Sequence, residues 1–459
     1  MVDHAPHRGA GRQGLTRETP AGDGETIAAV ATAPGRGGIG IVRVSGPRVP
    51  AIVEAVLGGP IAPRRAALRA FRDARGEPID SGLALFFPAP RSFTGEDVLE
   101  LHGHGGPVVL DLLLARVLEL GARTARPGEF SERAFLNGRL DLAQAEAVAD
   151  LIDAASPAAA RAATRSLQGA FSQEVEACAE VLTELRVYVE AALDFPDEEI
   201  DFLADPEITR RMQALEADLG ALSGRAREGV RLREGLCVVL CGAPNVGKST
   251  LLNRLSREEV AITSDQPGTT RDVLRADLSI AGVAVRLVDT AGLRDSPDPV
   301  EREGVRRARE AIAAADVVIW LLDPAAPNPP ETPPVGAGAR LIRVWNKADL
   351  GAPPPAWRAP GDLCLSARTG CGVAALEAAI RDAAGEAPGE GVFLARRRHL
   401  DALRRARQAV ARARHALEAG PELSAEELRL AQQALGEITG EVTTEALLGR
   451  IFSSFCIGK

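Results

Sequence analysis

Lysine is almost absent from this chain, since only three of its 54 Lys+Arg positions are lysine. They are Lys248, Lys347 and Lys459. A composition so biased towards arginine would replace lysine wherever a generic positive charge suffices. The remaining lysines therefore mark places where a compact ammonium differs from a planar guanidinium. Two of them lie in motifs typical of a nucleotide site, and the third marks the C-terminal end as a candidate second site.

Other absences narrow the class of protein. Aromatic residues make up only 3% of the chain, so its cores must be built from aliphatic side chains. The six cysteines form no CxxC pair, which favours reduced thiols in a cytoplasmic protein over a disulfide framework or a metal cluster. No apolar run approaches the roughly 18 to 20 residues of a membrane span. The net charge of −9 argues against a dedicated nucleic-acid binder, although a local basic face is compatible with it.

The 459 residues are too many for one ordinary core, so we expect two or three domains. Helical periodicity lies on both sides of a stretch in which strands and helices alternate. This order predicts a helical domain interrupted by an inserted α/β domain, a fold of the α/β plus α class. The expected divisions are a disordered extension over 1–24, an α+β domain over 25–139, a first helical part over 140–233, the inserted domain over 234–390, and a second helical part with a docked C-terminal tail over 391–459.

Several elements are predicted within these divisions. Pro107–Leu120 has the pattern of a helix closed by Gly121, and Asp141–Ile152 that of an amphipathic helix. Ser156 is expected to cap a further helix that has Pro157 at its first position. Strands are expected over Thr26–Ala31, Gly40–Val44, Leu83–Phe87, Val98–His102, Leu236–Cys241, Val283–Asp289, Val317–Leu322, Leu341–Trp345 and Leu363–Leu365.

The clearest motif follows one of these strands. Gly242-Ala-Pro-Asn-Val-Gly-Lys-Ser249 lies between the strand Leu236–Cys241 and a predicted helix, which is the context of a phosphate-binding loop. Its glycines let backbone N–H groups surround phosphates, and the helix N-terminus favours anions. Lys248 is expected to reach the β- and γ-phosphates, and Ser249 to offer its hydroxyl to Mg²⁺.

Three further GTPase motifs follow in order. Asp289-Thr-Ala-Gly292 ends a strand and places a carboxylate near the metal. Asn346-Lys-Ala-Asp349 supplies Asp349, which can accept two hydrogen bonds from guanine but not from adenine, and Ser366-Ala-Arg368 can present backbone N–H groups to the base. The residues expected to contact GTP in these motifs are Asn245, Val246, Gly247, Lys248, Ser249, Thr250, Asp289, Thr290, Ala291, Gly292, Asn346, Lys347, Ala348, Asp349, Ser366, Ala367 and Arg368.

The catalytic group is less evident. Leu293 stands where Ras-like proteins often place a water-orienting glutamine, so another side chain must act. The acidic segment that follows offers candidates. Asn245, with the segment Gly268–Asp272 downstream, could hold a monovalent cation; a loop-stabilising hydrogen bond is the alternative for Asn245. The acidic candidates are Asp295, Asp298, Glu301 and Glu303.

With these motifs the chain resembles the tRNA wobble-uridine modification GTPase family from Thr26 to Lys459. The resemblance rests on the GTPase set and on four further segments: Pro34–Gly40, Ser92–Asp97, Ala125–Ser131 and Phe452–Lys459. It implies an N-terminal α+β domain that binds folate and forms a homodimer, a helical domain, and an inserted Ras-like P-loop GTPase domain. It also implies an FAD-dependent partner, assembled with this chain as a heterotetramer. Together they would build an aminomethyl or carboxymethylaminomethyl group at C5 of uridine 34 in tRNA.

The resemblance also implies roles for individual residues. Asn245, Ser264, Gln266 and Thr269 would surround K⁺, and Ser249 and Thr270 would bind Mg²⁺. Glu301 would orient the attacking water. The site for 5-formyl-tetrahydrofolate, or a related one-carbon folate, would be lined by Arg43, Glu100, Arg139 and Lys459. The segment expected to complete the GTP site consists of Ser264, Asp265, Gln266, Pro267, Gly268, Thr269 and Thr270.

Other candidates have ordinary structural interpretations beside the functional ones. His102 and His104 suggest a metal, but no further ligand cluster accompanies them, so structural histidines are favoured. The arginine-rich stretch Arg396–Arg414 could contact tRNA phosphate. A solvated helix face paired with the acidic stretch Glu422–Glu427 is the favoured alternative. Cys456 is either a catalytic nucleophile or a small buried thiol.

Two functions compete at this point. The first is a GTP-hydrolysing tRNA-modification enzyme that uses GTP, Mg²⁺, K⁺ and a folate. The second is a ribosome-assembly GTPase that acts as an RNA-binding switch. Proteins of the second kind usually carry a basic RNA-binding domain, which this acidic chain lacks, so the first function is favoured.

Overall fold

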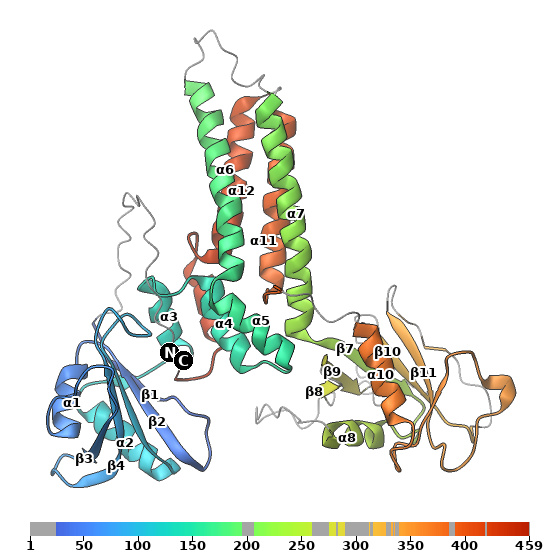
Figure 1. Ribbon diagram of the computed structural model, residues 1–459, viewed down its shortest axis with the longest axis horizontal. Coiled ribbons are helices and arrows are strands. Elements are labelled where there is room, and N and C mark those ends of the chain that lie inside the picture. The colour runs from blue at the N-terminus through green and yellow to red at the C-terminus, as the bar shows by residue number, and fades with distance from the viewer. Residues whose placement is uncertain are drawn as a thin grey trace, which may run out of the picture. The chain divides into compact units, whose positions relative to one another are not determined.

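The computed structural model describes residues 24–194, 206–258, 275–280, 283–289, 312, 315–326, 332–333, 335, 339–384, 391–417 and 420–458. The chain divides into two compact units. The first joins Met1–Leu140 to Thr444–Lys459, and the second spans Asp141–Thr443. The second unit contains a helical part and an α/β part (Figure 1).

The N-terminal unit is built on a six-stranded sheet with the strand order β3-β4-β5-β2-β1-β6. The strands pair antiparallel except for β1 and β6, which are parallel. Helices α1 (Val49–Leu57) and α2 (Pro107–Glu119) share one buried aliphatic core with the sheet. The strands are β1 (Ile27–Val30), β2 (Gly37–Ser45), β3 (Ala67–Arg72), β4 (Pro78–Phe87), β5 (Val98–Gly105) and β6 (Arg123–Thr124).

The C-terminal segment completes this unit. Helix α13 (Glu445–Phe452) begins at Thr444, whose hydroxyl accepts a hydrogen bond from the N–H of Leu447, and it packs against α3 (Glu129–Leu136). Phe452 and Phe455 are buried with their ring centroids 5.4 Å apart. The hydrophobic pattern of the tail predicted docking, and we expected the helical domain to receive it. Instead its aromatic side chains pack within the N-terminal unit.

Gly128 explains why the tail fits there. It precedes α3 with φ 69°, a backbone conformation that favours glycine, and its N–H donates to the carbonyl oxygen of Cys456 at 3.4 Å. A Cβ at this position would lie 2.6 Å from the carbonyl oxygen of Phe452. The close approach of the tail therefore requires glycine at position 128.

The helical part of the second unit consists of six helices in the described residues. Four of them, α6, α7, α11 and α12, run side by side around one aliphatic core (Figure 1). The predicted cap is present, since the hydroxyl of Ser156 accepts from the N–H of Ala159. Asp141, which was not predicted as a cap, forms a capping box with Gln144. The helices are α4 (Leu142–Ile152), α5 (Pro157–Leu167), α6 (Ala170–Asp194), α7 (Pro206–Glu234), α11 (Arg397–Ala416) and α12 (Pro421–Thr439).

The α/β part carries a second six-stranded sheet with the order β12-β11-β10-β7-β9-β8. All neighbours are parallel except β8 and β9. Every residue of β10 is buried, because aliphatic clusters cover both faces of the sheet. The elements are β7 (Leu236–Gly242), α8 (Lys248–Glu258), β8 (Arg275–Ile280), β9 (Val283–Asp289), β10 (Val317–Leu322), β11 (Arg340–Trp345), β12 (Leu363–Cys364) and α10 (Val373–Ala384).

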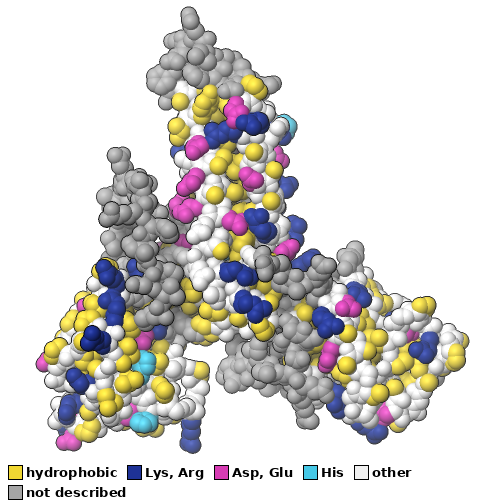
Figure 2. Space-filling model, viewed as in Figure 1, with side chains coloured by type: hydrophobic (Ala, Val, Ile, Leu, Met, Phe, Trp, Pro, Cys, Tyr) yellow, Lys and Arg dark blue, Asp and Glu magenta, His cyan; other side chains and the backbone are white. Residues whose placement is uncertain are grey.

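Charged side chains of both signs alternate over the visible face of the helical part (Figure 2). No helix among the described residues is long and apolar enough to cross a membrane. The six cysteines are free thiols, and those of Cys371 and Cys456 are exposed.

Candidate functional site

The phosphate loop connects β7 to α8. Gly242 and Gly247 have φ values of 151° and 100°, and Asn245 has φ 62°. Asparagine tolerates this left-handed conformation better than most side chains do. A Cβ on Gly247 would lie 2.3 Å from Nδ2 of Asn346, so only glycine fits at this position. The backbone therefore adopts the turn that aims successive N–H groups at an anion.

Lys248 closes over this loop. Its Nζ donates to the carbonyl oxygens of Gly242 at 3.0 Å and Ala243 at 3.1 Å, and the residue is buried. The ammonium thus lies within the turn that it would share with a phosphate. Ser249 and Thr250 follow in the first turn of α8 and are exposed. The role of Ser249 as a Mg²⁺ ligand stays a prediction of the motif.

Asn346 joins the phosphate loop to the candidate base site. Its Nδ2 donates to the carbonyl oxygen of Val246 at 2.7 Å, and its Oδ1 accepts from the N–H of Ala367 at 2.9 Å. Asn346 is 2% exposed. Because both amide atoms are used, this buried side chain fixes two loops that lie far apart in the sequence.

Asp349 is held in its ionised form. The Ser366 hydroxyl donates to Oδ1 at 2.6 Å, and the Arg368 guanidinium donates to Oδ2 at 2.8 Å. The hydrogen bond from Ser366, together with the charge of Arg368, keeps the pKa of Asp349 below its ordinary value. A carboxylate accepts hydrogen bonds only, which suits the two N–H donors on one edge of guanine.

Two contacts in this region were not predicted from the sequence. Lys347 has φ 60°, and its Nζ bonds Asp323 at 2.6 Å. Although burial of Asp323 opposes ionisation, the bond to Lys347 outweighs it, and the pKa of Asp323 is lowered. The sequence did contain an indication of the contact between Lys347 and Asp323, because Asp323 directly follows the buried strand β10. Arg254 of α8 donates to the carbonyl oxygens of Ala367 at 2.7 Å and Arg368 at 2.6 Å. A lone arginine on a helix gives no such signal.

The structure thus brings Asn245–Ser249, Asn346–Asp349 and Ser366–Arg368 together along one edge of the sheet. Asp289 is the last residue of β9, next to β7 in the sheet, and nothing is described of its side chain. The remaining candidates lie outside the described residues. They are Ser264, Asp265, Gln266, Pro267, Gly268, Thr269, Thr270, Thr290, Ala291, Gly292, Asp295, Asp298, Glu301, Glu303 and Lys459.

A second cluster of polar side chains lies in the N-terminal unit. Arg43 of β2 and Glu100 of β5 are cross-strand partners, and an Arg43 guanidinium nitrogen lies 2.9 Å from Glu100 Oε1. The guanidinium lies over two aromatic rings, Phe93 and Phe130, at 5.7 Å from each ring centroid. Neither phenylalanine was singled out in the sequence, although both fall within segments that carry the family resemblance.

The tail reaches this cluster. The guanidinium of Arg43 donates to the carbonyl oxygen of Gly458 at 3.3 Å, which places the chain leading to Lys459 beside Arg43. Arg139 is exposed, and its side chain lies next to Gly95 in the loop that also carries Phe93. The described contacts do not link Arg139 to Arg43 or Glu100. Two of the four predicted folate residues are therefore in direct contact.

The histidines of β5 follow the structural interpretation. His102 Nε2 lies 3.1 Å from Glu100 Oε2, and His104 Nδ1 lies 2.8 Å from Asp80. Burial opposes ionisation of Asp80, but its hydrogen bonds from His104 prevail and lower the pKa of the carboxyl. In the part of the chain that the structure describes, no group of three or more His, Cys, Asp or Glu side chains could hold a metal ion.

Known proteins resemble this chain over most of its length. Residues 26–139 match the family described as GTP-binding protein TrmE N-terminus, and residues 142–456 match the MnmE helical domain. The tRNA modification GTPase MnmE of Methylococcus capsulatus is 57% identical over 450 residues, covering 95% of this chain and 99% of that protein. The protein of the same name from Alkalilimnicola ehrlichii is 56% identical over 446 residues, with the same coverage. A solved structure of Era from Aquifex aeolicus aligns with 24% identity over 38% of this chain and 66% of that one, at a TM-score of 0.26.

A phosphate loop between a strand and a helix, followed along the same sheet edge by a guanine-type base site, defines a P-loop GTPase. The near-complete match to curated relatives then settles the family. The chain belongs to the MnmE family of tRNA modification GTPases.

Proposed function

We infer that this protein hydrolyses GTP as part of the chemistry that modifies the wobble uridine of tRNA. The observation that carries the nucleotide assignment is the pair of bonds made by Asn346, which joins the phosphate loop to the loop of Ser366. Asp349 completes that base site as an ionised acceptor. GTP would thus be recognised at its base and its phosphates by one connected set of loops.

The proposed sites for Mg²⁺ and K⁺ both include residues of the phosphate loop or of the helix that follows it. The Ser249 hydroxyl is exposed at the start of α8 and fits the oxygen donors that Mg²⁺ prefers. Asn245 is exposed in the loop, where its side-chain oxygen could face a K⁺ ion together with Ser264, Gln266 and Thr269. Thr270 would be the second Mg²⁺ ligand. Both cations would supply positive charge to the phosphates during hydrolysis, and Glu301 would orient the attacking water.

The cluster around Arg43 supports a folate site. Folate carries a pterin whose N–H groups suit the Glu100 carboxylate and a glutamate tail whose carboxylates suit Arg43 and Lys459. The faces of Phe93 and Phe130 add an apolar surface beside these charges. The donor set therefore fits 5-formyl-tetrahydrofolate or a related one-carbon folate, with Arg139 at the neighbouring loop. Cys456 lies in the same tail with its thiol exposed, as a reactive group would have to be.

The wider assignment follows the family. A homodimer of this chain would act with an FAD-dependent partner as a heterotetramer, in the cytoplasm, to add an aminomethyl or carboxymethylaminomethyl group at C5 of uridine 34. The test is nucleoside analysis of tRNA from a deletion strain, complemented with the wild-type gene. Loss of the C5 modification at position 34, restored on complementation, is expected. Unchanged tRNA nucleosides together with a defect in ribosome assembly would contradict the proposal and favour the assembly-GTPase alternative.

A further inference from the structure

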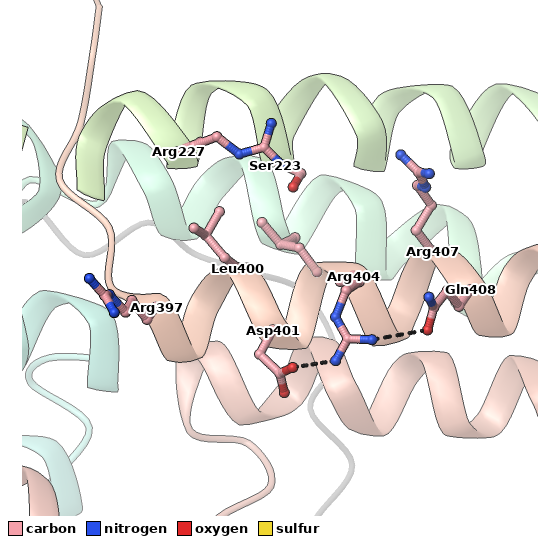
Figure 3. Close-up of a pocket in the computed structure, with 9 residues that line it drawn as sticks. Ser223, Arg227, Arg397, Leu400, Asp401, Arg404, Arg407 and Gln408 are labelled. Atoms are coloured by element: carbon pink, nitrogen blue, oxygen red, sulfur yellow. Dashed lines mark hydrogen bonds and ion pairs between the residues drawn. The ribbon is translucent and has the colours of Figure 1, made fainter. Parts of the chain in front are cut away.

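A groove of about 550 Å³ lies between α7 and α11, outside both candidate sites (Figure 3). Four of its nine lining residues are arginines, against one carboxylate, that of Asp401. The arginines come from both helices, and they are Arg227, Arg397, Arg404 and Arg407. The groove therefore has a strongly positive lining in a chain whose net charge is −9.

Two of these arginines are already paired. Arg404 donates to Asp401 at 2.5 Å and to the side chain of Gln408 at 3.3 Å, and Arg397 donates to Glu234 at 2.7 Å. Arg227 and Arg407 differ from them. Both are exposed, and neither makes a hydrogen bond or an ion pair with any residue in the ranges that the structure describes. Two guanidinium groups from different helices thus remain available to a ligand in this groove.

The other arginines of α11 show how unusual this is. Arg398 bonds Glu146, Arg405 bonds Glu437, and Arg412 bonds Glu427, each with a nitrogen–oxygen distance of 2.8 Å or less. Of these three pairs, only that of Arg412 with Glu427 involves the acidic stretch Glu422–Glu427 expected from the sequence, since Arg398 and Arg405 pair with Glu146 and Glu437 instead. Arg407 is the exception, and it lies on the side of α11 that faces α7.

The side chain of Arg407 extends towards α7, so its charge and that of Arg227 lie in the same groove. One of its guanidinium nitrogens lies 3.5 Å from where a Cβ of Gly220 would be, so the side chain reaches across to α7. Gly220 and Arg227 are seven residues apart, about two helical turns or roughly 10 Å along that helix.

The side chains that line the groove indicate which kind of ligand it would bind. A guanidinium presents forked N–H donors that match phosphate oxygens, and the Ser223 hydroxyl and Gln408 amide add neutral donors nearby. Leu400 and Leu403 contribute apolar surface suited to sugar carbons. From Arg397 to Arg407 the lining extends over roughly 15 Å of α11, which exceeds the reach of a single phosphate group.

We propose that this groove binds the sugar-phosphate backbone of RNA, which, on the function proposed above, is that of the tRNA substrate. Arg227 and Arg407 contact the phosphates directly, whereas the charges of Arg397 and Arg404 are offset by Glu234 and Asp401. Such contacts fix the position of the RNA but read no bases, because phosphates carry no sequence information.

The test uses the full-length protein with the double substitution Arg227→Gln and Arg407→Gln. Both side chains are exposed and unpaired, so the variant should fold normally. Binding of an unmodified tRNA transcript is measured by fluorescence anisotropy over a series of salt concentrations. We expect Kd to rise roughly tenfold or more at moderate salt, and the slope of log Kd against log salt concentration to decrease by about two, one for each lost phosphate contact. Intrinsic GTP hydrolysis should be unchanged.

The matched control is Arg210→Gln with Arg429→Gln, which alters the net charge equally. Both arginines are exposed on helices of the same part, pair with a neighbouring glutamate on their own helix, and do not line the groove. An equal loss of tRNA affinity in the control would overturn the proposal, as would unchanged tRNA binding in the groove variant. Polyglutamate that binds as tightly as tRNA, with the same dependence on Arg227 and Arg407, would indicate an acidic protein partner and would also overturn it. Groove-dependent tRNA binding without wobble modification would leave the groove assigned and contradict only the proposed function.

Discussion

The side-chain amide of Asn346 donates to the carbonyl oxygen of Val246, a residue exactly one hundred positions earlier in the chain, at 2.7 Å. Its oxygen simultaneously accepts from Ala367. A single buried amide thus sets the spacing between the loop that would hold the phosphates and the loop that would hold the base.

Replacing Asn346 by Ala should therefore weaken both GTP and GDP. The substitution leaves the Val246 carbonyl and the Ala367 N–H without their partner, at a cost of about 1–3 kcal/mol for each buried group. We expect Kd for either nucleotide, measured by calorimetry, to rise at least roughly tenfold. Asn346→Asp is the informative comparison, because it can still accept from Ala367 but cannot donate to Val246. Equal affinities in the wild type and both variants would contradict the role given to this amide.

Guanine specificity should reside in Asp349. An Asp349→Asn variant should shift its preference from GTP to xanthosine triphosphate, because an amide can donate to the base carbonyl where the carboxylate accepted from an amino group. Competition binding with the two nucleotides measures the shift. Asp323→Asn serves as a control, since it alters a neighbouring carboxylate that bonds Lys347. Retained preference for GTP in the Asp349 variant would show that the base is recognised elsewhere.

Hydrolysis should be faster in K⁺ than in Na⁺. A fitted cation would supply charge to the transition state, and the sequence provides no glutamine after the Asp289–Gly292 motif. GTP turnover measured in KCl and in NaCl at equal concentration tests this prediction. Equal rates in the two salts would contradict the assignment of a K⁺ site.

Glu301→Ala should leave nucleotide affinity nearly intact and lower kcat by at least roughly tenfold, since the group would act mainly in the transition state. Steady-state kinetics alongside nucleotide titration separate the two effects. An unaffected kcat would direct attention to Asp295, Asp298 or Glu303.

Deleting Cys456–Lys459 should impair the modification site and spare the GTPase. The deletion removes the Gly458 carbonyl that Arg43 contacts, together with Lys459. We expect formyl-tetrahydrofolate binding to weaken by about 1–3 kcal/mol, with uridine modification abolished or sharply reduced and GTP turnover unchanged. Cys456→Ser isolates the thiol, because it keeps the backbone that bonds Gly128. Normal folate binding by the truncated protein, or loss of its GTPase activity, would assign the tail to another site.

Stability should decline as the pH falls from neutral towards 5, in part because of His399. This residue is buried on α11 against Glu146, with Nε2 and Oε2 2.9 Å apart. Burial, reinforced by the charge of Arg398, lowers the pKa of His399 from 6.5 to about 4. The unfolded chain therefore takes up a proton between these pKa values that the folded chain resists, and the folded state loses stability as pH falls through that window.

For His399 alone the expected loss at pH 5 is about 2 kcal/mol. Urea unfolding followed by far-ultraviolet circular dichroism at pH 7 and pH 5 measures it. His399→Gln, which keeps a donor for Glu146 but does not titrate, should show a smaller difference between the two pH values. The same pH dependence in both proteins would assign the effect to other groups.

Local patterns predicted much of this structure, and the failures have two causes. Five strands of the GTPase part were predicted, because buried parallel strands appear as continuous apolar runs, as in Val317–Leu322. Strand β8, which pairs antiparallel with β9 at the edge of the sheet, was missed. Strand β3 was missed because most of its residues are at least partly exposed and its pattern is not alternating. In the candidate sites, motif spacing gave the loops around Lys248 and Asp349. The bond from Lys347 to Asp323 and the placement of Phe130 beside Arg43 depend on long-range packing that no local pattern encodes.

The docking of the tail shows this most clearly. Phe452 and Phe455 were expected to be buried, and they are, but an apolar run does not state which surface will cover it. The partner surface includes Gly128, more than 300 positions earlier, whose missing side chain makes room for the tail. In the sequence, the surface that receives the tail is indicated only by one glycine among 46.

Because Thr444–Lys459 belongs to the same unit as the first 140 residues, that unit stays incomplete until the ribosome has also added residues 444–459. At roughly 5 to 20 residues per second, the ribosome needs on the order of 20 to 60 s to add the intervening residues. During this time the nascent chain can already contain every residue of the nucleotide site, while the surface around Gly128 and Arg43 still lacks the C-terminal segment that packs on it. A ribosome that stops early would therefore release a protein equipped for GTP but without the finished pocket of the N-terminal unit.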